Sequence, residues 1–590
     1  MKVLLANPPW LRPGWYGVRA GSRWPHLERA DSPYMPFPFL LGYAAAVLEA
    51  DGVEVEVVDA CAERLDRAAF LERVAAAKPD VFMAEISTPS FAEDMETFQG
   101  LRDLGFDGPI LAAGIHKPMF DPAFFERNDL IDGVLVGEYE LTLREFLRQG
   151  AAPTSAIPGL IWNTADGPID GGRKPSQLGL DEFPWPARHL FPMERYHDLP
   201  GGLPSPSVQL WGSRGCSFTC SFCAWPQILY GDNAYRTRDA HAVADEVLAM
   251  QKAGYASVYF DDDTFNLGKR RTADIARAFQ DKGVQMPWAF MGRADTCDPR
   301  QYEDLVKTGL MAVKYGVESA DTARLKQIGK NLDVERVRES IRVVKTLGIK
   351  VHLTFMFGLP GETLDTMQRT LDLAYELDPD SAQFTVATPF PGSRLHTELT
   401  AAGRLDGIDL SDLDGYRSGV VSTDALEADQ IVSFVHGVHR RWETRSRPAG
   451  VAPKIPLAEI GGSGVSVALL ARQGDDEWLA AALQAALEQE GPSRELIVVG
   501  EEGGTLAESA AAVCDWATWI DVPVGTTTSA MINAVPERCV GRWIATFQPG
   551  ALPGPGWLKA VVAAGQGARD VGALALPFDD GSSSALTLGA

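Results

Sequence analysis

The stretch Cys216-Ser-Phe-Thr-Cys220-Ser-Phe-Cys223 decides the interpretation of the whole chain. It brings three of the seven cysteines together, directly after a predicted strand and a turn that contains Gly212 and Gly215. A structural zinc site normally needs four closed ligands, and no CxxC or HxxxH partner lies nearby. A four-iron cluster can instead be held by three cysteines, with its fourth iron open to another ligand. The spacing therefore favours an iron–sulfur cluster over a zinc site.

Strand and helix patterns alternate from Val208 onward, just before this motif and on its carboxyl side. Six strand-like runs, with helical patterns between them, predict a partial (β/α)6 barrel over residues 206–400. The chemistry of such a barrel is expected at the carboxyl ends of its strands. The expected strands are Val208–Trp211, Ala256–Phe260, Trp288–Met291, Ala312–Gly316, Lys350–Phe357 and Gln383–Ala387.

The first 150 residues show the same alternation and predict a separate doubly wound parallel sheet. Ligands of such a sheet bind beyond the carboxyl ends of its strands. The segments expected at that edge are Asn7-Pro8-Pro9, Asp59-Ala60-Cys61, Glu85-Ile86-Ser87-Thr88, Gly114-Ile115-His116 and Gly137-Glu138. The sequence thus predicts an α/β protein with two sites at strand ends.

Three further regions complete the predicted organisation. Residues 151–205 are rich in Pro and Gly with little periodicity, which is typical of a linker. Residues 401–450 are predicted to be a mainly helical extension, and Ser446–Pro453 to be a second linker. A small α/β domain is expected over 455–590.

The cysteine motif resembles the CxxxCxφC signature of the radical S-adenosylmethionine (SAM) superfamily, with Phe222 as the aromatic φ. The resemblance covers about residues 206–400 and implies a [4Fe–4S] cluster on Cys216, Cys220 and Cys223. It also implies that SAM chelates the open iron and is split into a 5′-deoxyadenosyl radical. The residues implied to contact SAM are Asp261, Asp262 and Asp263 for the methionyl amino group, Arg293, Glu318 and Ser319 for the ribose and carboxylate, and Gly358 on the adenine side.

The N-terminal domain, which opens with Asn7-Pro8-Pro9, resembles the cobalamin-binding domain of cobalamin-dependent radical SAM enzymes. The DxHxxG motif that supplies a cobalt-binding histidine in the mutases is absent. His116 is therefore expected to line the pocket or to support the fold, and not to bind cobalt. The residues implied to contact cobalamin are Asn7, Ser87, Thr88, Gly114, His116, Gly137 and Glu138.

Together these resemblances imply a cobalamin-dependent radical SAM methyltransferase that methylates an unactivated carbon of a small molecule. Displacement chemistry needs a nucleophile, which an sp³ carbon cannot offer, and this explains two cofactors in one chain. No catalytic base is assigned. The alternatives are a radical cyclase, oxidase or rearrangement enzyme without methyl transfer, and an iron–sulfur or zinc module that senses redox state.

The C-terminal region is similar to the nucleotide-sugar half of family-2 glycosyltransferases. In that family an Asp follows the second strand and an Asp-x-Asp ends a later strand, where it holds the metal. The corresponding segments here are Gly500-Glu501-Glu502 and Phe547-Gln548-Pro549-Gly550. Because the metal-binding carboxylates are missing, a degenerate docking or substrate-presenting domain is expected.

Composition narrows the possible partners. The 590 residues carry 54 Lys and Arg against 79 Asp and Glu, a formal charge of −25, so neither nucleic acid nor an anionic membrane is an expected partner. Seven unevenly spaced cysteines do not form a disulfide framework, and a cytoplasmic location is expected. The expected partners are a small-molecule substrate and an external electron donor such as flavodoxin or ferredoxin.

Overall fold

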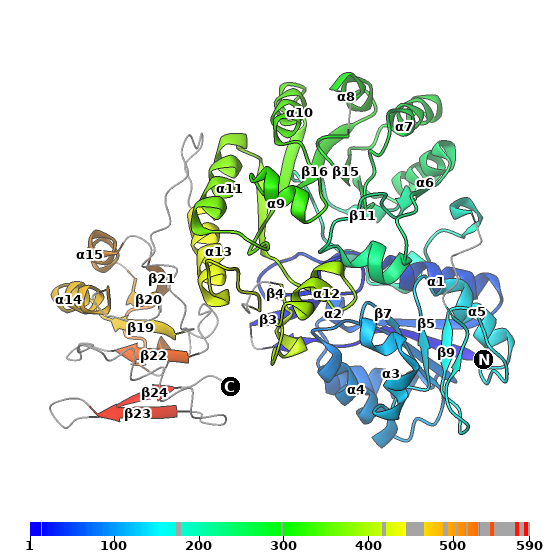
Figure 1. Ribbon diagram of the computed structural model, residues 1–590, viewed down its shortest axis with the longest axis horizontal. Helices are drawn as coiled ribbons and strands as arrows, with labels where there is room; N and C mark the ends of the chain where they lie inside the picture. The colour runs from blue at the N-terminus through cyan, green and yellow to red at the C-terminus, as the bar shows by residue number, and fades with distance from the viewer. Residues whose placement is uncertain are drawn as a thin grey trace. The chain divides into compact units, whose positions relative to one another are not determined.

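The computed structural model is shown in Figure 1. The residues that it describes are 1–12, 14–172, 179–296, 299–415, 420–443, 465–487, 494–502, 505–514, 517–528, 530–531, 543–547, 573–577 and 583–587. The predicted linker Ser446–Pro453 and the segment 548–550 lie outside these residues. The chain divides into two units, one of residues 1–361 and 372–416 and one of residues 362–371 and 417–590.

A seven-stranded sheet, in the order β10-β9-β8-β7-β6-β1-β5, forms the N-terminal domain. Its five parallel strands confirm the predicted doubly wound fold. All six residues of β6 are buried, as expected for a parallel strand covered on both faces. The strands are β1 (Lys2–Asn7), β5 (Glu54–Asp59), β6 (Val81–Ile86), β7 (Ile110–Gly114), β8 (Gly133–Leu135), β9 (Leu160–Trp162) and β10 (Ile169–Asp170).

Helices cover both faces of this sheet. Residues of α3 and α4 join the hydrophobic core on one face, and α1 packs beside α5. The helices are α1 (Phe39–Ala50), α2 (Ala60–Glu63), α3 (Arg67–Ala77), α4 (Phe91–Asp103) and α5 (Glu140–Arg148), with short 3-10 helices η1 (Lys117–Phe120) and η2 (Pro122–Glu126).

Two parts of the N-terminal domain were not predicted. The antiparallel strands β9 and β10 come from the Pro- and Gly-rich segment after residue 150 and extend the edge of the sheet. That segment also forms the 3-10 helices η3 (Leu180–Glu182), η4 (Arg188–Leu190) and η5 (Met193–Arg195). A three-stranded antiparallel sheet of β2 (Leu11–Arg12), β3 (Trp15–Val18) and β4 (His26–Arg29) follows β1.

The second domain is an open half-barrel of six parallel strands, in the order β11-β14-β15-β16-β17-β18, as predicted. The helices at residues 240–252, 269–282 and 334–346 lie on the outer face of the sheet (Figure 1). The strands are β11 (Ser207–Leu210), β14 (Ser257–Phe260), β15 (Trp288–Gly292), β16 (Leu310–Glu318), β17 (Lys350–Phe357) and β18 (Ser381–Val386). The helices are α6 (Ala240–Lys252), α7 (Lys269–Lys282), α8 (Pro299–Val306), α9 (Thr322–Gln327), α10 (Val334–Thr346), α11 (Leu364–Leu377) and α12 (Arg394–Ala401).

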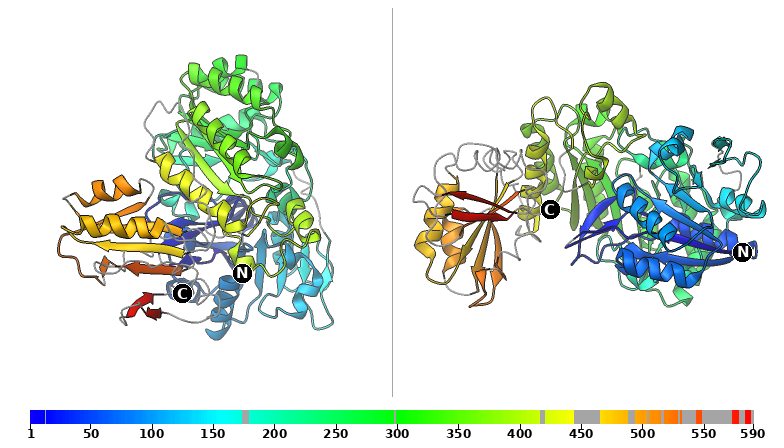
Figure 2. Two further views of the ribbon diagram at one scale, coloured as in Figure 1. Left: turned by 60° about the vertical axis from the view of Figure 1, so that its left-hand side comes forward. Right: turned by 90° about the horizontal axis from the view of Figure 1, so that it is seen from below.

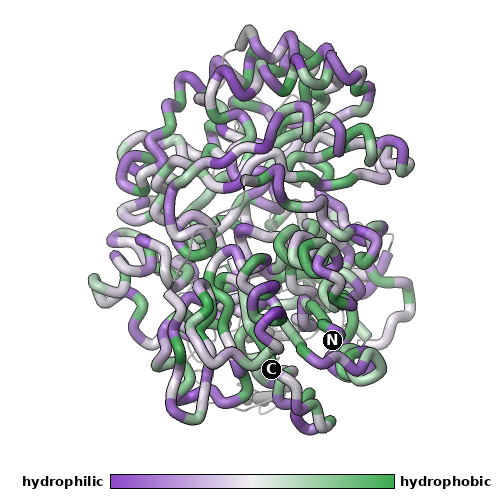
Figure 3. The backbone as a smooth tube through the Cα atoms, turned by 90° about the vertical axis from the view of Figure 1, so that its right-hand side faces the viewer, coloured by the Kyte–Doolittle hydropathy of each residue, from purple (hydrophilic) through white to green (hydrophobic). Residues whose placement is uncertain are grey.

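The barrel helices are amphipathic. In α7 the residues Thr272, Ile275, Ala276 and Phe279 are buried while the charged positions face outward, the spacing of a helix with one apolar face. Figure 3 shows the same alternation of hydrophobic and hydrophilic residues along the outer helices at the top of the view. A small hairpin of β12 (Ser213–Arg214) and β13 (Arg236–Thr237), the π-helix η6 (Trp225–Tyr230) and the 3-10 helix η7 (Leu410–Asp412) complete this part.

The second unit contains helix α13 (Ala428–Glu443) and a four-stranded parallel sheet in the order β21-β20-β19-β22. Helices α14 (Asp476–Leu487) and α15 (Leu506–Val513) cover one face of that sheet (Figure 2). The strands are β19 (Val465–Ala471), β20 (Arg494–Glu501), β21 (Thr518–Val522) and β22 (Trp543–Phe547), with a separate hairpin of β23 (Ala573–Pro577) and β24 (Ser583–Thr587). The sheet agrees with the predicted α/β domain.

Glu501 stands where a nucleotide-binding acid would be expected in this sheet, and its carboxylate is bonded to residues of its own domain. The Glu501 carboxylate accepts hydrogen bonds from the backbone of Gln473 at 3.2 Å and of Gly525 at 2.8 Å, and it pairs with Arg472 at 3.2 Å. These bonds lower the pKa of Glu501. The likeness to glycosyltransferases stays a prediction. No helix among the described residues is both long and apolar enough to span a membrane.

Candidate functional site

The three motif cysteines face one cavity of about 200 Å³ at the carboxyl ends of the barrel strands. Cys216, Cys220 and Cys223 are free thiols. The loop that carries them begins where β12 pairs with β13. Gly215, between β12 and Cys216, has a φ of +86°, and a Cβ there would lie 2.0 Å from the carbonyl oxygen of Ala234. Only glycine fits this position, so the turn fixes where the first thiol begins.

The loop is held in shape by its backbone. The Gln227 side-chain amide donates to the carbonyl oxygens of Cys220 at 3.1 Å and Cys223 at 2.6 Å, and the Ser221 amide donates to the carbonyl oxygen of Ile328 at 2.7 Å. These hydrogen bonds use backbone groups of the cysteine loop, and the cysteine side chains face the cavity.

Burial favours the neutral form of two of these thiols. Burial raises the pKa of Cys220 and raises that of Cys223 well above its usual value, while Lys330 and Arg293 oppose the shift at Cys220. Among the described residues no three His, Cys, Asp or Glu side chains are grouped to hold a single metal ion. In a four-iron cluster each cysteine binds a different iron, so three thiols around one cavity fit that group.

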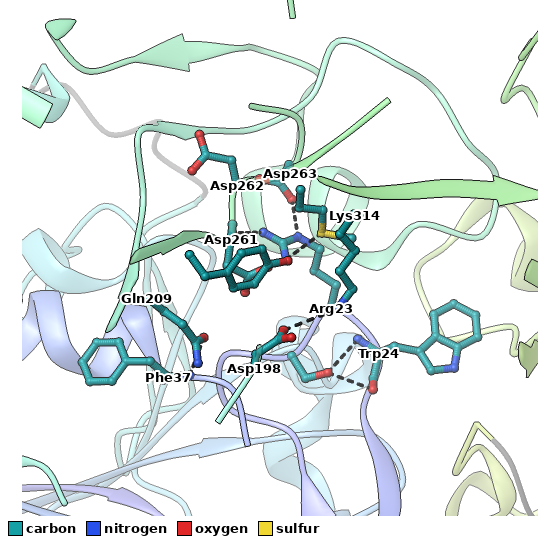
Figure 4. Close-up of polar contacts among 12 residues, drawn as sticks. Arg23, Trp24, Phe37, Asp198, Gln209, Asp261, Asp262, Asp263 and Lys314 are labelled. Carbon is teal, nitrogen blue, oxygen red and sulfur yellow. Dashed lines mark hydrogen bonds and ion pairs between the residues drawn. The ribbon is translucent and has the colours of Figure 1, made fainter. Parts of the chain in front are cut away.

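Three consecutive acids follow β14, and only two of them face the cavity. Asp261 and Asp263 line it. Asp262 is bound on the other side, where it accepts hydrogen bonds from the Gly212 amide at 2.8 Å and the Ser213 hydroxyl at 2.5 Å. Burial raises the pKa of Asp262 to about 7. Asp262 therefore supports the turn before the cysteine loop (Figure 4).

Arg23, from the segment between β3 and β4, crosses to the two acids that face the cavity. Its Nη1 lies 2.8 Å from Oδ1 of Asp261, and its Nε lies 3.0 Å from Oδ1 of Asp263. Its Nη2 donates to the carbonyl oxygen of Asp261. The guanidinium also lies over the ring of Trp225, 4.6 Å from its centroid. Figure 4 shows Arg23 between these carboxylates.

Of the other residues predicted to contact SAM, Arg293 and Glu318 line the cavity, whereas Ser319 and Gly358 do not. Arg293 lines the cavity, forms a two-pronged ion pair with Asp295 at 3.0 and 2.9 Å, and lies 3.7 Å from the ring centroid of Phe218 in the cysteine loop. Glu318 also lines the cavity and pairs with Lys330 at 2.5 Å.

Ser319 and Gly358 do not belong to the residues that line this cavity. Ser319 is fully buried, and its hydroxyl accepts a hydrogen bond from the Asp321 amide at 3.1 Å. Gly358 follows β17 with a φ of +83°, a left-handed conformation that favours glycine. The place of both residues in SAM binding stays a prediction.

A buried ion pair lies in the same cavity beyond Asp261. Lys314, on β16, has its Nζ 3.3 Å from Oδ2 of Asp198, and both side chains are almost fully buried. Tyr34 and His26 line the cavity with them. Paired charges are stabilised when buried together, and Figure 4 shows Asp198 and Lys314 near Arg23.

A second, much smaller cavity lies at the carboxyl ends of the N-terminal strands. Its volume is about 20 Å³, and its lining includes Ser87, Gly114 and Trp225. Gly21 and Ser22 line both cavities, so the two sites adjoin. The space accommodates about one water molecule, and a corrinoid would bind there only if the side chains over the strand ends moved.

Asn7, at the end of β1, is held by buried hydrogen bonds. Its side chain donates to Oδ1 of Asp59 at 2.7 Å and accepts from Nε of Arg19 at 2.9 Å. Arg19 also forms a buried ion pair with Asp94 at 2.6 Å. This network ties three strand ends together beneath the small cavity.

His116 and Thr88 form a buried pair. His116 Nδ1 lies 3.3 Å from the Thr88 hydroxyl, and the ring stacks on Phe91 with centroids 4.3 Å apart. Burial lowers the pKa of His116 to about 4. The imidazole is therefore neutral, and these contacts favour the structural part of the prediction for His116.

Glu138 joins the two domains. Its Oε1 accepts a hydrogen bond from Nη1 of Arg214 at 2.7 Å, and the same nitrogen donates to Glu140 at 2.7 Å. Arg236 donates to the other oxygen of Glu138 at 2.5 Å. Gly137, just before it, has a φ of +82°. The carboxylate that was predicted to contact cobalamin thus binds the segment that leads to Cys216.

Family models match both domains. The radical SAM superfamily matches residues 212–374 and the B12 binding domain matches residues 29–147. The chain is a radical SAM enzyme with a cobalamin-binding domain. The predicted class and its three cofactors, a [4Fe–4S] cluster, SAM and cobalamin, are confirmed at the level of these families.

Methyltransferases are among the relatives of this radical SAM enzyme. The cytidylyl-2-hydroxyethylphosphonate methyltransferase of Streptomyces wedmorensis is 29% identical over 71% of this chain and 88% of its own length. The anaerobic magnesium-protoporphyrin IX monomethyl ester cyclase of Rubrivivax gelatinosus is 25% identical over 75% of this chain and 77% of its own. The solved structure of the radical SAM methyltransferase TsrM from Kitasatospora setae shares the fold, with a TM-score of 0.53, 20% identity, and coverage of 69% of this chain and 77% of that one.

Sequence reasoning missed several residues of the radical SAM enzyme's two cavities. Arg19, Arg23 and Trp24 come from residues 10–38, which carry no motif that the prediction used. Glu85 lines the small cavity and accepts a hydrogen bond from Tyr139 at 2.7 Å. A closely spaced Arg and Trp in an otherwise irregular segment was the only available signal.

Proposed function

We propose that this enzyme transfers a methyl group from SAM to an unactivated carbon of a small molecule. The observation that supports this proposal best is the joint placement of the two cavities. Cys223 faces the cavity of the acids, Trp225 lines the cavity at the cobalamin-side strand ends, and Gly21 and Ser22 line both. Two cofactors at these places would face one another across η6.

The residues proposed to hold the cluster and SAM surround the larger cavity. Cys216, Cys220 and Cys223 would bind three irons, and Asp261 and Asp263 would accept hydrogen bonds from the methionyl ammonium. Arg293 and Glu318 would lie along the rest of SAM. When bound, the cluster and SAM supply a radical that removes hydrogen from carbon, and cobalamin supplies the methyl group.

Aromatic side chains exclude water from the cavity of the proposed reaction. Trp24 packs edge-on against Phe222 of the cysteine loop, with ring centroids 6.3 Å apart, and against Phe390 at 5.2 Å. A dry site protects a reactive radical from side reactions. The chain thus contributes orientation and exclusion of water to this chemistry.

For cobalamin, the proposed contacts are the backbone and small residues at the strand ends. Ser87 and Gly114 line the small cavity, and a Cβ at Gly114 would lie 2.3 Å from the carbonyl oxygen of Ile86. Asn7, Thr88, His116 and Glu138 would act from behind these contacts, since their side-chain bonds lie within the protein, and Gly137 would act through its backbone.

The proposed substrate is a small molecule with at least one polar or charged group. The Asp198–Lys314 pair supports this, because it places two opposite charges in the lining of the cavity, in addition to the residues proposed to hold the cluster and SAM. An external low-potential donor such as flavodoxin or ferredoxin is proposed to supply the electrons.

The test is anaerobic turnover of the reconstituted full-length protein with SAM labelled in its methyl group. Cytidylyl-2-hydroxyethylphosphonate and tryptophan, which relatives methylate by their names, are suitable first substrates, alongside extracts of the host. Label in a product supports the proposal. Formation of 5′-deoxyadenosine with an unlabelled, oxidised or cyclised product would instead favour the chemistry of the cyclase relative.

A further inference from the structure

The site of the SAM ammonium already contains a cation. The proposed function assigns that ammonium to the acids after β14, where both carboxylates face the cavity. One guanidinium, that of Arg23, donates to Asp261 Oδ1 at 2.8 Å, to Asp263 Oδ1 at 3.0 Å and to the carbonyl oxygen of Asp261. An ammonium with three donors would use the same kind of acceptors.

We propose that Arg23 is an internal competitor of SAM, which must leave Asp261 and Asp263 before the methionyl ammonium can bind there. This inference rests on the proposed function for the identity of the ligand. It adds a residue outside the barrel that sets the affinity and the selectivity of the SAM site.

The charges at the site explain why a competitor would be needed. Asp261 and Asp263 are each about 5% exposed or less, and a buried carboxylate without a partner is costly. The neighbouring cation Lys314 is paired with Asp198. Asp263 also accepts hydrogen bonds from the Tyr230 hydroxyl and the Gly215 amide, both at 3.0 Å, and Asp261 accepts one from the Tyr259 hydroxyl at 3.3 Å. These donors are neutral, and Arg23 is the cation that pairs with both carboxylates.

The surroundings of Arg23 allow it to leave. Its side chain is 16% exposed, and it borders a cavity of about 200 Å³ into which the guanidinium could turn. Its remaining contacts are weak ones, with the face of Trp225 and with Met291 Sδ at 3.7 Å. By contrast, Arg19 of the same segment is 4% exposed and is bound by Asp94, Asn7 and Ser90.

Competition of this kind has a defined effect on affinity. When only a fraction of the protein has the site open, the observed dissociation constant is raised by the inverse of that fraction. Removal of Arg23 should thus tighten the binding of ligands that carry the ammonium. A residue that helps to hold SAM would have the opposite effect.

The test compares three ligands on the reconstituted, unreduced full-length protein by equilibrium binding. SAM and S-adenosylhomocysteine carry the amino acid group, and methylthioadenosine lacks it. In Arg23→Met, which keeps the stem over Trp225, we expect SAM and S-adenosylhomocysteine to bind about tenfold more tightly and methylthioadenosine to bind unchanged. Arg23→Lys keeps the charge but lacks the forked donors. Its affinities for SAM and S-adenosylhomocysteine should therefore lie between those of the wild type and those of Arg23→Met.

Arg29→Met is the matched control, because Arg29 is itself partly exposed, forms an ion pair with the exposed Asp31 and lies on the adjacent strand β4. It should change none of the three affinities. Weaker binding of SAM to Arg23→Met, or an equal change for all three ligands, would overturn the inference. Failure of the wild-type protein to bind SAM at all would instead overturn the proposed function.

Discussion

The two proposed cofactor sites differ in how far they are formed before a cofactor binds. At the barrel, three thiols and two carboxylates face a cavity of about 200 Å³. At the N-terminal sheet the cavity is about 20 Å³, and the polar side chains predicted as contacts are bonded to other residues of the protein. The comparison teaches that the SAM site is prepared by side chains, whereas the cobalamin site depends on the backbone at strand ends and on movement above them.

The largest effect is expected from the cysteines. Cys220→Ala should abolish SAM cleavage, with at least about a hundredfold loss, because a cluster ligand is removed. Binding of cobalamin, followed by its absorption spectrum, should persist. Cys61→Ala, which removes a buried thiol of the N-terminal domain, is the control and should keep the iron content. Loss of cobalamin from Cys220→Ala would show that the two sites are not independent.

A somewhat smaller effect, on the free energy of unfolding, is expected from Arg214, which binds Glu138 and Glu140 of the N-terminal domain. Arg214→Met would leave Glu138 and Glu140, both almost fully buried, without their shared partner. Breaking such a buried pair costs about 3–5 kcal/mol of the free energy of unfolding, measured by denaturant unfolding. Arg236→Met, which removes a partly exposed partner of Glu138 alone, should cost less than about 1 kcal/mol. Equal costs would contradict the role of Arg214.

Glu85 gives the N-terminal site a pH dependence. Burial raises the pKa of this carboxyl to about 7, above its value in the unfolded chain. The folded protein therefore holds the proton more tightly, so stability from this group is full below about pH 4.5 and falls as the pH rises to about 7. Because Gln does not ionise, Glu85→Gln should remove this pH dependence, which amounts to at most about 3 kcal/mol of the free energy of unfolding.

The measurement for Glu85 is unfolding of both proteins at pH 5.5 and pH 8. The variant should gain relative to the wild type at the higher pH, since Tyr139 can still donate to the amide oxygen. A difference between the proteins that does not depend on pH would contradict the raised pKa.

The smallest effect is expected at Gly114, where φ is +108°. Gly114→Ala should weaken cobalamin binding about tenfold and cost about 1–3 kcal/mol through strain, while SAM binding is unchanged. Gly105→Ala, at a φ of +84° with no atom within 4 Å of the added Cβ, carries similar strain without the contact. If both variants bind cobalamin equally, the strand-end backbone does not form that site.

The regular parts of the fold were predictable because they follow periodicity. The predicted run Lys350–Phe357 is β17 to the residue, and buried parallel strands such as β7 have the continuous apolar pattern that marks them. The strands β9 and β10, of three and two residues, carry no such signal, and the sequence indicated only a linker there.

The candidate site was predictable where a motif carries it. The cysteines and the acids after β14 lie together as expected, but the pattern could not tell that Asp262 faces away, because consecutive residues of an extended segment alternate sides. Arg23 was missed for a different reason. Its partners are 238 and 240 residues away in sequence, and only the tertiary structure brings them together.

The most direct test of the account is the electron paramagnetic resonance spectrum of the reduced, reconstituted full-length protein. The account places an iron without a protein ligand in the cavity that also holds Asp261 and Asp263. SAM should therefore change the signal of the reduced cluster, while methylthioadenosine should leave it unchanged. A full complement of iron and sulfide whose signal does not respond to saturating SAM would contradict the account.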